Sequence, residues 1–385
     1  MGAMNQAARR TTKIGVIGAG TAGLAASLAL AQRGFEVTVL EKHPELAPLG
    51  AGMLIQPQGI RALTELGVAD PFHAASVPVT LLKGTSHRGW TLVDIPYDAA
   101  EARGVSRMAL SQVLLDAALA AGVHVKYERA VDKIVVQGHQ AQLLGPNLDD
   151  EFDLVIIADG AASRLPAQVG LAAVSRVYKW GALWGMFDVE NWAAETVLEQ
   201  RYHGTEKMFG LMPTARVGKR MRLSLFWSLP CHRYQEWRQA PIEVWKDEMR
   251  KLWPNAEPVI SQIVRHDQVA FATYRHARVK RLAAGPVCVI GDAAHSMSPQ
   301  LGLGSTLAVQ DALSLAQSVA QFGAVDGAAH YSKRRMLTVH AYQALSCTLT
   351  PCFQARGSAL WRDLLFASSL KVPGMRRIMY RSIAS

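Results

Sequence analysis

Cysteine is scarce in this chain: only four occur among 385 residues, and none belongs to a CxxC pair or lies in a cluster with histidine. That scarcity excludes a disulfide framework and the common zinc sites, and it favours a reducing, cytoplasmic location. No stretch approaches the roughly 18 consecutive apolar residues that a membrane-spanning helix needs. Residues 1–12 are polar and basic instead of apolar, so we do not expect an export signal.

Several catalytic signatures are also missing. The sequence has no HExxH metal motif, no nucleophile elbow with an ordered Ser, His and Asp set, and no internal repeat or low-complexity tract. Hydrophobic residues make up 50% and charged residues 19%, which is ordinary for a globular chain. The length allows a large core, or two domains that share one.

Positive charge is concentrated at the end of the chain. From His330 to Ser385 there are nine Lys or Arg residues and a single acid, Asp363, in a sequence whose formal net charge is +10. One interpretation is a solvated, basic helical tail; a second is contact with an anionic membrane surface or an acidic partner. Nucleic acid is not an expected partner, because no recognition motif accompanies the charge.

A glycine-rich loop follows the first apolar run, residues 13–17. It contains Gly18, Gly20, Ala22 and Gly23, and it leads into an Ala- and Leu-rich helix over 22–33 and a β-branched strand over 36–40. In such a β-α-β unit the first Gly permits a tight turn and the second lets backbone approach a pyrophosphate. The third lets helix and strand pack closely. The pattern predicts a dinucleotide site in preference to a purely structural turn.

An acidic residue, Glu41, stands at the end of the second strand, 18 residues past Gly23, and Lys42 follows it. A carboxylate at this place accepts hydrogen bonds from both ribose hydroxyls and would repel a 2′-phosphate. We therefore place Glu41 and Lys42 in the predicted cofactor site, and NADP is disfavoured there.

Two later segments each consist of an apolar strand that ends in an Asp beside a Gly. The first, 153–164, contains Asp159; the second, 287–304, contains Gly-Asp292-Ala-Ala-His and then Pro299, Gly302 and Gly304. In an open α/β sheet, ligands lie beyond the carboxyl ends of the strands, where an Asp can hold a cofactor hydroxyl. The last two glycines open a predicted helix over 302–322, whose positive end would face an electron-rich ring edge.

The middle of the chain has a different composition. Seven of the nine tryptophans lie between Trp180 and Tyr274, together with predicted long strands over 181–189, 207–212 and 221–229. Residues 79–95 also alternate like antiparallel strands. The sequence therefore predicts an α/β protein in which a Rossmann-like, dinucleotide-binding domain carries an inserted β-rich domain, followed by a helical C-terminal region.

Taken in order, GxGxxG, a DG followed by Ser163-Arg164, and GDAAH-x3-P-x2-GxG resemble the FAD-dependent aromatic hydroxylases. These are the single-component flavin monooxygenases typified by p-hydroxybenzoate and salicylate hydroxylases. The resemblance covers about residues 13–355. Phe353-Gln354 with Arg362-Asp363 is similar to the C-terminal region of that family.

The resemblance assigns roles to individual residues. It implies that Asp292 contacts the ribityl chain of FAD, that Arg107 touches FAD, and that Asp159 helps to bind both FAD and NAD(P)H indirectly. Pro299 would lie over the reactive flavin carbon. The backbone from Gly302 through Leu303 to Gly304 would face N1 and O2 and stabilise the anionic reduced flavin.

The resemblance also implies a domain division and a reaction. The FAD-binding domain would comprise residues 13–78, 100–178 and 275–330, the β-sheet substrate domain 79–99 and 179–274, and the basic helical region 331–385. NADH or NADPH would reduce FAD, O2 would add at C4a, and the hydroperoxide would hydroxylate an aromatic or heteroaromatic, rather apolar small molecule. Because the flavin carries the chemistry, no residue is assigned as a certain catalyst, and His295 is expected to be structural. Trp184, Met212, Phe226 and Pro299 are the candidates for the substrate pocket.

Two departures from the family pattern leave details of FAD mobility and NAD(P)H handling open. Ala47 stands where many relatives carry Arg, and Leu303 where they often have Gln. Two alternatives remain: another FAD enzyme on the same scaffold, such as a halogenase or an isoprenoid-type reductase, or a non-catalytic flavin-binding protein. The WxWxIP element of tryptophan halogenases is absent, since Trp180-Gly-Ala-Leu-Trp184 lacks its spacing. Oligomeric state is not predicted.

Overall fold

The first unit of the fold is a mostly parallel sheet. The computed structural model of the chain describes residues 11–46, 52–97, 101–171, 173–298, 302–354, 359–372 and 374. Six strands lie in the order β18-β19-β12-β1-β2-β8, and only the β18–β19 pair is antiparallel. Their bounds are β1 (Lys13–Ile17), β2 (Glu36–Leu40), β8 (His124–Lys126), β12 (Leu154–Ile157), β18 (Ala283–Ala284) and β19 (Val287–Val289). The chain leaves β1 toward β2 on one side and has β12 on the other, so a crevice opens beyond the carboxyl end of β1.

Helices cover this sheet. They are α1 (Thr21–Ala31), α2 (Pro57–Glu65), α3 (Ala69–Ala74), α4 (Arg107–Ala120), α5 (Leu165–Gln168), α9 (Asp292–His295) and α10 (Gly304–Phe322). The Ala- and Leu-rich α1 is buried from Ala22 to Leu30, because α4 and α10 both pack against it. A helix that is apolar all round fits such a central position.

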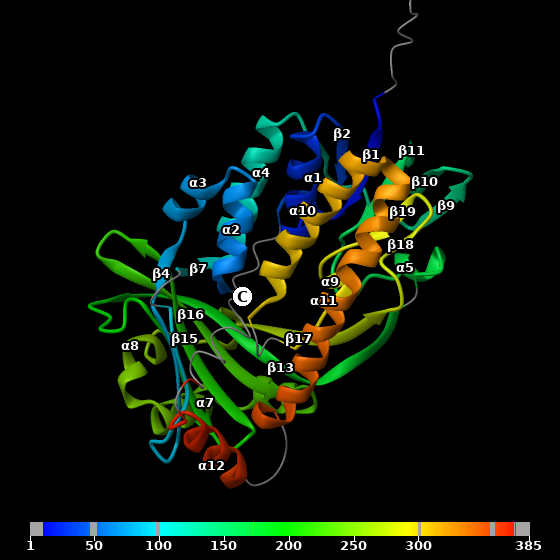
Figure 1. Cartoon of the computed structure of the whole chain (residues 1–385). Coiled ribbons are helices and arrows are strands. Elements are labelled where there is room, and N and C mark those ends of the chain that lie inside the picture. The colour runs from blue at the N-terminus through cyan, green and yellow to red at the C-terminus, as the bar shows by residue number, and fades with distance from the viewer. Residues whose placement is uncertain are drawn as a thin grey trace, which may run out of the picture.

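The second unit is a seven-stranded sheet in the order β17-β13-β16-β15-β14-β5-β6, antiparallel except for the parallel β14–β5 pair. Figure 1 shows it below the first sheet. Its strands are β5 (Leu81–Ser86), β6 (Thr91–Pro96), β13 (Ala173–Glu190), β14 (Val197–His203), β15 (Lys207–Val217), β16 (Arg220–Pro230) and β17 (Ala270–Val279).

The two faces of this sheet carry different side chains, because neighbouring residues of a strand point to opposite sides. Trp227 packs toward α6 (Tyr234–Gln239), α7 (Ile242–Leu252) and α8 (Glu257–Ile260) in a tryptophan-rich cluster. Phe226 packs in another apolar cluster, with Met212, Leu303 and Phe353, which we call the Leu303 cluster. Short 3-10 helices occupy Cys231–Arg233, Pro254–Ala256 and His266–Gln268.

Smaller elements join the two units. A three-stranded sheet contains β3 (Gly52–Ile55), β4 (Val77–Val79) and β7 (Ala102–Ser106), and another contains β9 (Lys133–Gln137), β10 (Gln140–Gly145) and β11 (Leu148–Phe152). The long helix α11 (Ala324–Phe353) runs from the first sheet down to the second, and α12 (Leu360–Ser369) packs on β6 (Figure 1). Among the described residues, no helix is both long and apolar enough to cross a membrane.

The observed architecture confirms the predicted fold class: an α/β dinucleotide-binding unit with an inserted, β-rich unit. The patterns did not predict β14, whose sequence VLEQRYH interrupts its apolar residues with charges and is mostly half-buried. The patterns also did not predict β11, because its sequence LDDEF is mostly acidic. The seven-stranded sheet uses residues from 81–96 and 173–279, and the exact domain limits stay a prediction.

Candidate active site

The glycine-rich loop between β1 and α1 has three glycines with three different surroundings. Gly18 adopts φ +102°, and a Cβ there would lie 2.8 Å from the Ala158 carbonyl oxygen. A Cβ on Gly23 would lie 2.0 Å from the Gly18 carbonyl oxygen, so helix and strand meet too closely for any side chain. A Cβ on Gly20 would meet no described atom within 4 Å. The space over Gly20 is therefore open to a ligand that approaches the backbone.

Glu41 lies beside this loop, directly after β2. Its Oε2 accepts a hydrogen bond from the Ala19 N–H at 2.8 Å, and its Oε1 accepts one from the His43 N–H at 3.0 Å. These two bonds fix the carboxylate at the carboxyl end of the sheet. Each oxygen keeps a further lone pair, so the group can still accept hydrogen bonds from a ribose diol.

Asp159, after β12, lies against the same loop. Its Cα is 3.0 Å from the position that a Cβ on Gly18 would take. Burial raises the pKa of the Asp159 carboxyl, while a hydrogen bond from Ser163 and the positive charge of Lys42 act to lower it. The glycine-rich loop and the segment 153–164 thus meet at one place, with the exposed Lys42 close enough to act on Asp159 electrostatically.

The segment 287–304 lies at the same place as the glycine-rich loop and Asp159. Gly291, with φ +59°, would place a Cβ 2.7 Å from the Ala22 Cβ of α1, so the segment packs directly on the loop helix. Asp292 is exposed at the start of α9. Its Oδ1 lies 3.8 Å from the position of a Cβ on Gly304, where α10 begins.

The N-terminus of α10 carries no side-chain cap, so its first N–H groups are available to a ligand. Gly302 before it has φ +60° and open space around its Cα, whereas Leu303 is only 2% exposed and points into the Leu303 cluster. Pro299 and Ala47 lie outside the described residues.

Arg107 begins α4, which Ser106 caps by accepting the Ala109 N–H at 3.1 Å. The guanidinium is exposed and acts electrostatically on Tyr274 of β17. Burial raises the pKa of Tyr274, and the positive charge of Arg107 offsets part of that rise. The Tyr274 hydroxyl also accepts a hydrogen bond from Trp184 Nε1 at 2.9 Å. Arg107 is thereby linked to the seven-stranded sheet.

The substrate candidates from the sequence gather in the Leu303 cluster. Met212 and Phe226 are buried members of it, and Trp184 and Tyr274 pack against it half-buried. The Trp184 and Phe226 rings meet edge to face, with centroids 4.9 Å apart. The structure therefore brings these residues together with the start of α10.

His295 is turned into the protein interior. Its Nε2 lies 2.5 Å from Asp311 Oδ2 of α10, and Asp311 also binds Arg335 Nε of α11 at 2.9 Å and the Gly291 N–H at 3.2 Å. Burial alone would lower the pKa of His295, but the charge and hydrogen bond of Asp311 raise it overall. This buried network ties α9, α10 and α11 together and supports a structural role for His295.

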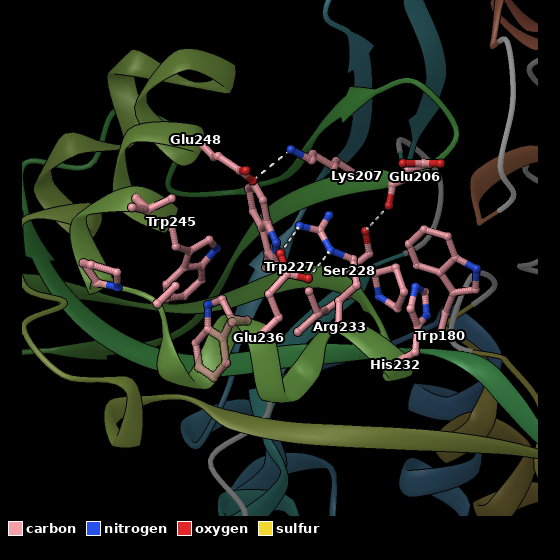
Figure 2. A pocket seen from close by; sticks show the side chains of 16 residues that line it. Trp180, Glu206, Lys207, Trp227, Ser228, His232, Arg233, Glu236, Trp245 and Glu248 are labelled. Carbon is pink, nitrogen blue, oxygen red and sulfur yellow. Dashed lines mark hydrogen bonds and ion pairs between the residues drawn. The ribbon is translucent and has the colours of Figure 1, made fainter.

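A cavity of about 260 Å³ lies on the opposite face of the seven-stranded sheet (Figure 2). Trp180, Trp227 and Trp245 line it, and ion pairs border it, Lys207 with Glu248 at 2.8 Å and Arg233 with Glu236 at 3.2 Å. Because Trp227 and Phe226 are neighbours on β16, this cavity is separated by the sheet from the Leu303 cluster. It is not part of the candidate active site.

The inserted unit also contains five histidines, four of which pack on other rings. His87 packs on His203, His266 on Trp237 and His276 on Tyr178, with ring centroids 4.5, 4.7 and 5.1 Å apart. His232 lines the cavity of Figure 2.

Sequence reasoning missed Tyr274 and Asp311. No local pattern marks Tyr274, since its position depends on the pairing of β13 with β17. Asp311 could have been suspected, because an acid inside an otherwise apolar helix needs a buried partner.

The comparisons with known proteins agree with this geometry. A family model described as an FAD binding domain matches residues 11–341. The chain is 27% identical over 319 residues to a probable 2-heptyl-3-hydroxy-4(1H)-quinolone synthase of Rhodococcus erythropolis, with 79% of this chain and 78% of the relative covered. It is 26% identical to a 6-hydroxynicotinate 3-monooxygenase of Pseudomonas fluorescens over 82% and 84% of the two chains. The crystal structure of Klebsiella pneumoniae HpxO complexed with FAD and uric acid superposes with a TM-score of 0.81 at 20% identity, covering 97% of this chain and 96% of that one.

Proposed function

Because the chain belongs to the FAD binding domain family, we propose that it is an FAD-dependent monooxygenase that uses NAD(P)H and O2. Its substrate is an aromatic or heteroaromatic small molecule. The observation that carries this proposal is the convergence of Gly20, Glu41, Asp159, Asp292 and the uncapped start of α10 at one crevice.

These residues fit FAD. The open backbone at Gly20 leaves room for the pyrophosphate, and the fixed carboxylate of Glu41 suits the adenosine ribose. Asp292, beside Gly304, would hold the ribityl chain, while Arg107 would contact the cofactor from α4. The flavin ring would lie toward the N-terminus of α10. Bound FAD supplies the activation of O2 at the expense of NAD(P)H.

The protein would position the cofactor, stabilise negative charge on it and exclude water from the substrate side. The positive end of α10 stabilises negative charge on a ring edge placed before it. Leu303, the buried N-cap residue of α10, belongs to the same apolar cluster as Met212 and Phe226. Water is therefore excluded from the side on which a substrate ring would lie.

We propose a rather apolar ring with one polar group as the substrate. Trp184, Met212 and Phe226 supply apolar contacts, and the Tyr274 hydroxyl and the Arg107 guanidinium supply the polar end. The names of the relatives favour a heteroaromatic ring, since they include a quinolone synthase and a hydroxynicotinate monooxygenase.

The test is a turnover experiment on the purified chain. We expect a yellow protein that oxidises NADH or NADPH faster when candidate heteroaromatics are added, consumes O2, and releases a product heavier by one oxygen atom. A colourless protein that cannot be reconstituted with FAD would refute the proposal. Product formation that depends on chloride would indicate a halogenase instead. Full FAD occupancy without NAD(P)H oxidation on a broad substrate panel would indicate a flavin-binding protein.

Three finer points are proposals as well. The domain limits are those given from the sequence, at 78/79, 99/100, 178/179, 274/275 and 330/331. The location is the cytoplasm, for which the scarcity of cysteine is the support. The basic C-terminal region makes weak contact with an anionic membrane surface, for which its excess of Lys and Arg is the support.

A further inference from the structure

Helix α12 buries its two charged residues and exposes three large apolar ones. Arg362 and Asp363 are fully buried, at 0% exposure, while Trp361 is 52% exposed, Leu364 49% and Leu365 57%. The three apolar residues are three and four positions apart, so they share one side of the helix. Because monomeric soluble proteins rarely expose clustered large apolar side chains, this face indicates a contact with something else.

The buried side of α12 fixes this orientation. Arg362 donates from Nε to Asp363 Oδ1 at 2.8 Å and from Nη1 to the Cys352 carbonyl at 3.0 Å, and its guanidinium lies 5.5 Å from the Tyr202 ring. Asp363 also pairs with Arg88 Nη1 at 3.1 Å. Turning the helix to bury its leucines would break these contacts and leave charged groups without their partners, which would strongly destabilise the fold. The apolar face therefore stays outward.

A groove continues the face. It measures about 410 Å³ and lies between α12 and β6, where Trp90, Leu364, Leu370 and Lys371 line it together with one half-buried acid, Asp94. Val372 beyond the helix is 51% exposed as well. The exposed Trp361, Leu364 and Leu365, with the exposed Lys371 just after the helix, have the composition of helices that lie in the membrane interface.

Charge identifies the occupant. After Asp363 the sequence has Lys371, Arg376, Arg377 and Arg381 and no acidic residue. A second copy of this chain would carry the same excess of positive charge in its C-terminal region and would be repelled, whereas anionic lipid headgroups would be attracted. We propose that the exposed face of α12, formed by Trp361, Leu364 and Leu365, docks this protein on an anionic lipid bilayer surface.

This docking surface specifies the membrane contact proposed above. Only the benefit of docking, access to an apolar substrate, rests on the proposed function. Phe366 on the inner side of α12 packs against Phe353 of the Leu303 cluster, with ring centroids 5.5 Å apart. Docking would therefore bring the wall of the proposed substrate site close to the lipid, from which an apolar substrate can be drawn.

The experiment measures co-sedimentation of the full-length, FAD-loaded protein with vesicles. The vesicles contain phosphatidylcholine alone or phosphatidylcholine with phosphatidylglycerol, at low and high salt. We expect binding to the anionic vesicles, weakened by salt. The double variant Leu364→Ser/Leu365→Ser should bind about tenfold more weakly, because two apolar side chains leave the interface. The matched control Leu337→Ser removes another leucine, 81% exposed on α11, and should bind like the wild type.

Several outcomes would overturn the inference. They are an absence of wild-type binding at low salt, equal binding by the double variant, or an equal loss in the Leu337→Ser control. A wild-type dimer that the double variant converts to monomers, seen by sedimentation velocity without vesicle binding, would assign the face to a second copy. FAD content and NAD(P)H oxidation are measured in parallel. A chain that binds vesicles but oxidises no NAD(P)H would refute the proposed function and leave the docking intact.

Discussion

Two glycine-to-alanine substitutions in the loop after β1 separate what the fold needs from what the cofactor needs. In Gly23→Ala the new methyl would lie 2.0 Å from the Gly18 carbonyl oxygen, about 1.4 Å closer than ordinary contact begins. Since the neighbour is backbone, β1 and α1 must move apart. Overpacking of this kind costs about 1–3 kcal/mol of unfolding free energy.

Gly20→Ala should behave in the opposite way. The backbone there has φ −81°, which any residue adopts, and the methyl meets no described atom within 4 Å. The apo protein should be as stable as the wild type or more stable by about 0.4–1 kcal/mol. The methyl would occupy the approach of the pyrophosphate, so FAD affinity should fall at least about tenfold, or about 1.4 kcal/mol.

The assay is urea unfolding of each apo protein, with FAD titration followed by flavin fluorescence. A Gly20→Ala protein that binds FAD like the wild type would refute the placement of the pyrophosphate over Gly20. A Gly23→Ala protein with unchanged stability would refute the close approach of α1 to β1. Loss of both properties in both variants would mean that the loop does not divide its roles in this way.

Three further predictions concern buried polar groups. His295→Gln should cost about 3 kcal/mol of unfolding free energy at low pH. Since Asp311 raises the pKa of His295 in the folded protein, the stabilisation by this pair is complete below the unfolded pKa of about 6.5 and disappears as pH rises through the folded pKa. Urea titrations across pH will detect this change. Tyr274→Phe should raise KM for a substrate with a polar group more than it lowers kcat, whereas an unchanged KM would remove Tyr274 from the site. Arg362→Met leaves the carboxylate of Asp363 buried with one partner fewer, so the midpoint of urea unfolding should fall by an amount equivalent to about 3–5 kcal/mol.

The parts of the fold that the sequence predicted are those set by local pattern. The loop from Gly18 to Gly23, the strand before it and the helix after it form a continuous unit. Gly18 and Gly23 are required by close contacts within the chain, whereas Gly20 leaves room for a ligand. The later Asp159 and Asp292 could be placed beside it, because strands of a parallel sheet end at one edge.

What the sequence could not predict depends on contacts between distant segments. Tyr274 reaches Trp184 only through the pairing of β13 with β17. In α12, residue type alone predicts Trp361 inside and Arg362 outside, yet the structure has the reverse. The reason is that distant segments supply the partners: the Cys352 carbonyl and the Tyr202 ring hold Arg362, and Arg88 of the β5–β6 hairpin pairs with Asp363.

The parallel pairing of β5 with β14 has a mechanical consequence. Residues 81–86 lie beside residues 197–203, so the seven-stranded sheet is built from two pieces of chain, and β8 and β12 of the six-stranded sheet lie between them in the sequence. The polypeptide therefore passes between the two sheets several times, and α11 adds a rigid strut across them. Because every crossing would have to bend together, we expect the two sheets to resist opening about a single hinge. We therefore expect ligand exchange to depend on side chains and short segments at the rim of the crevice.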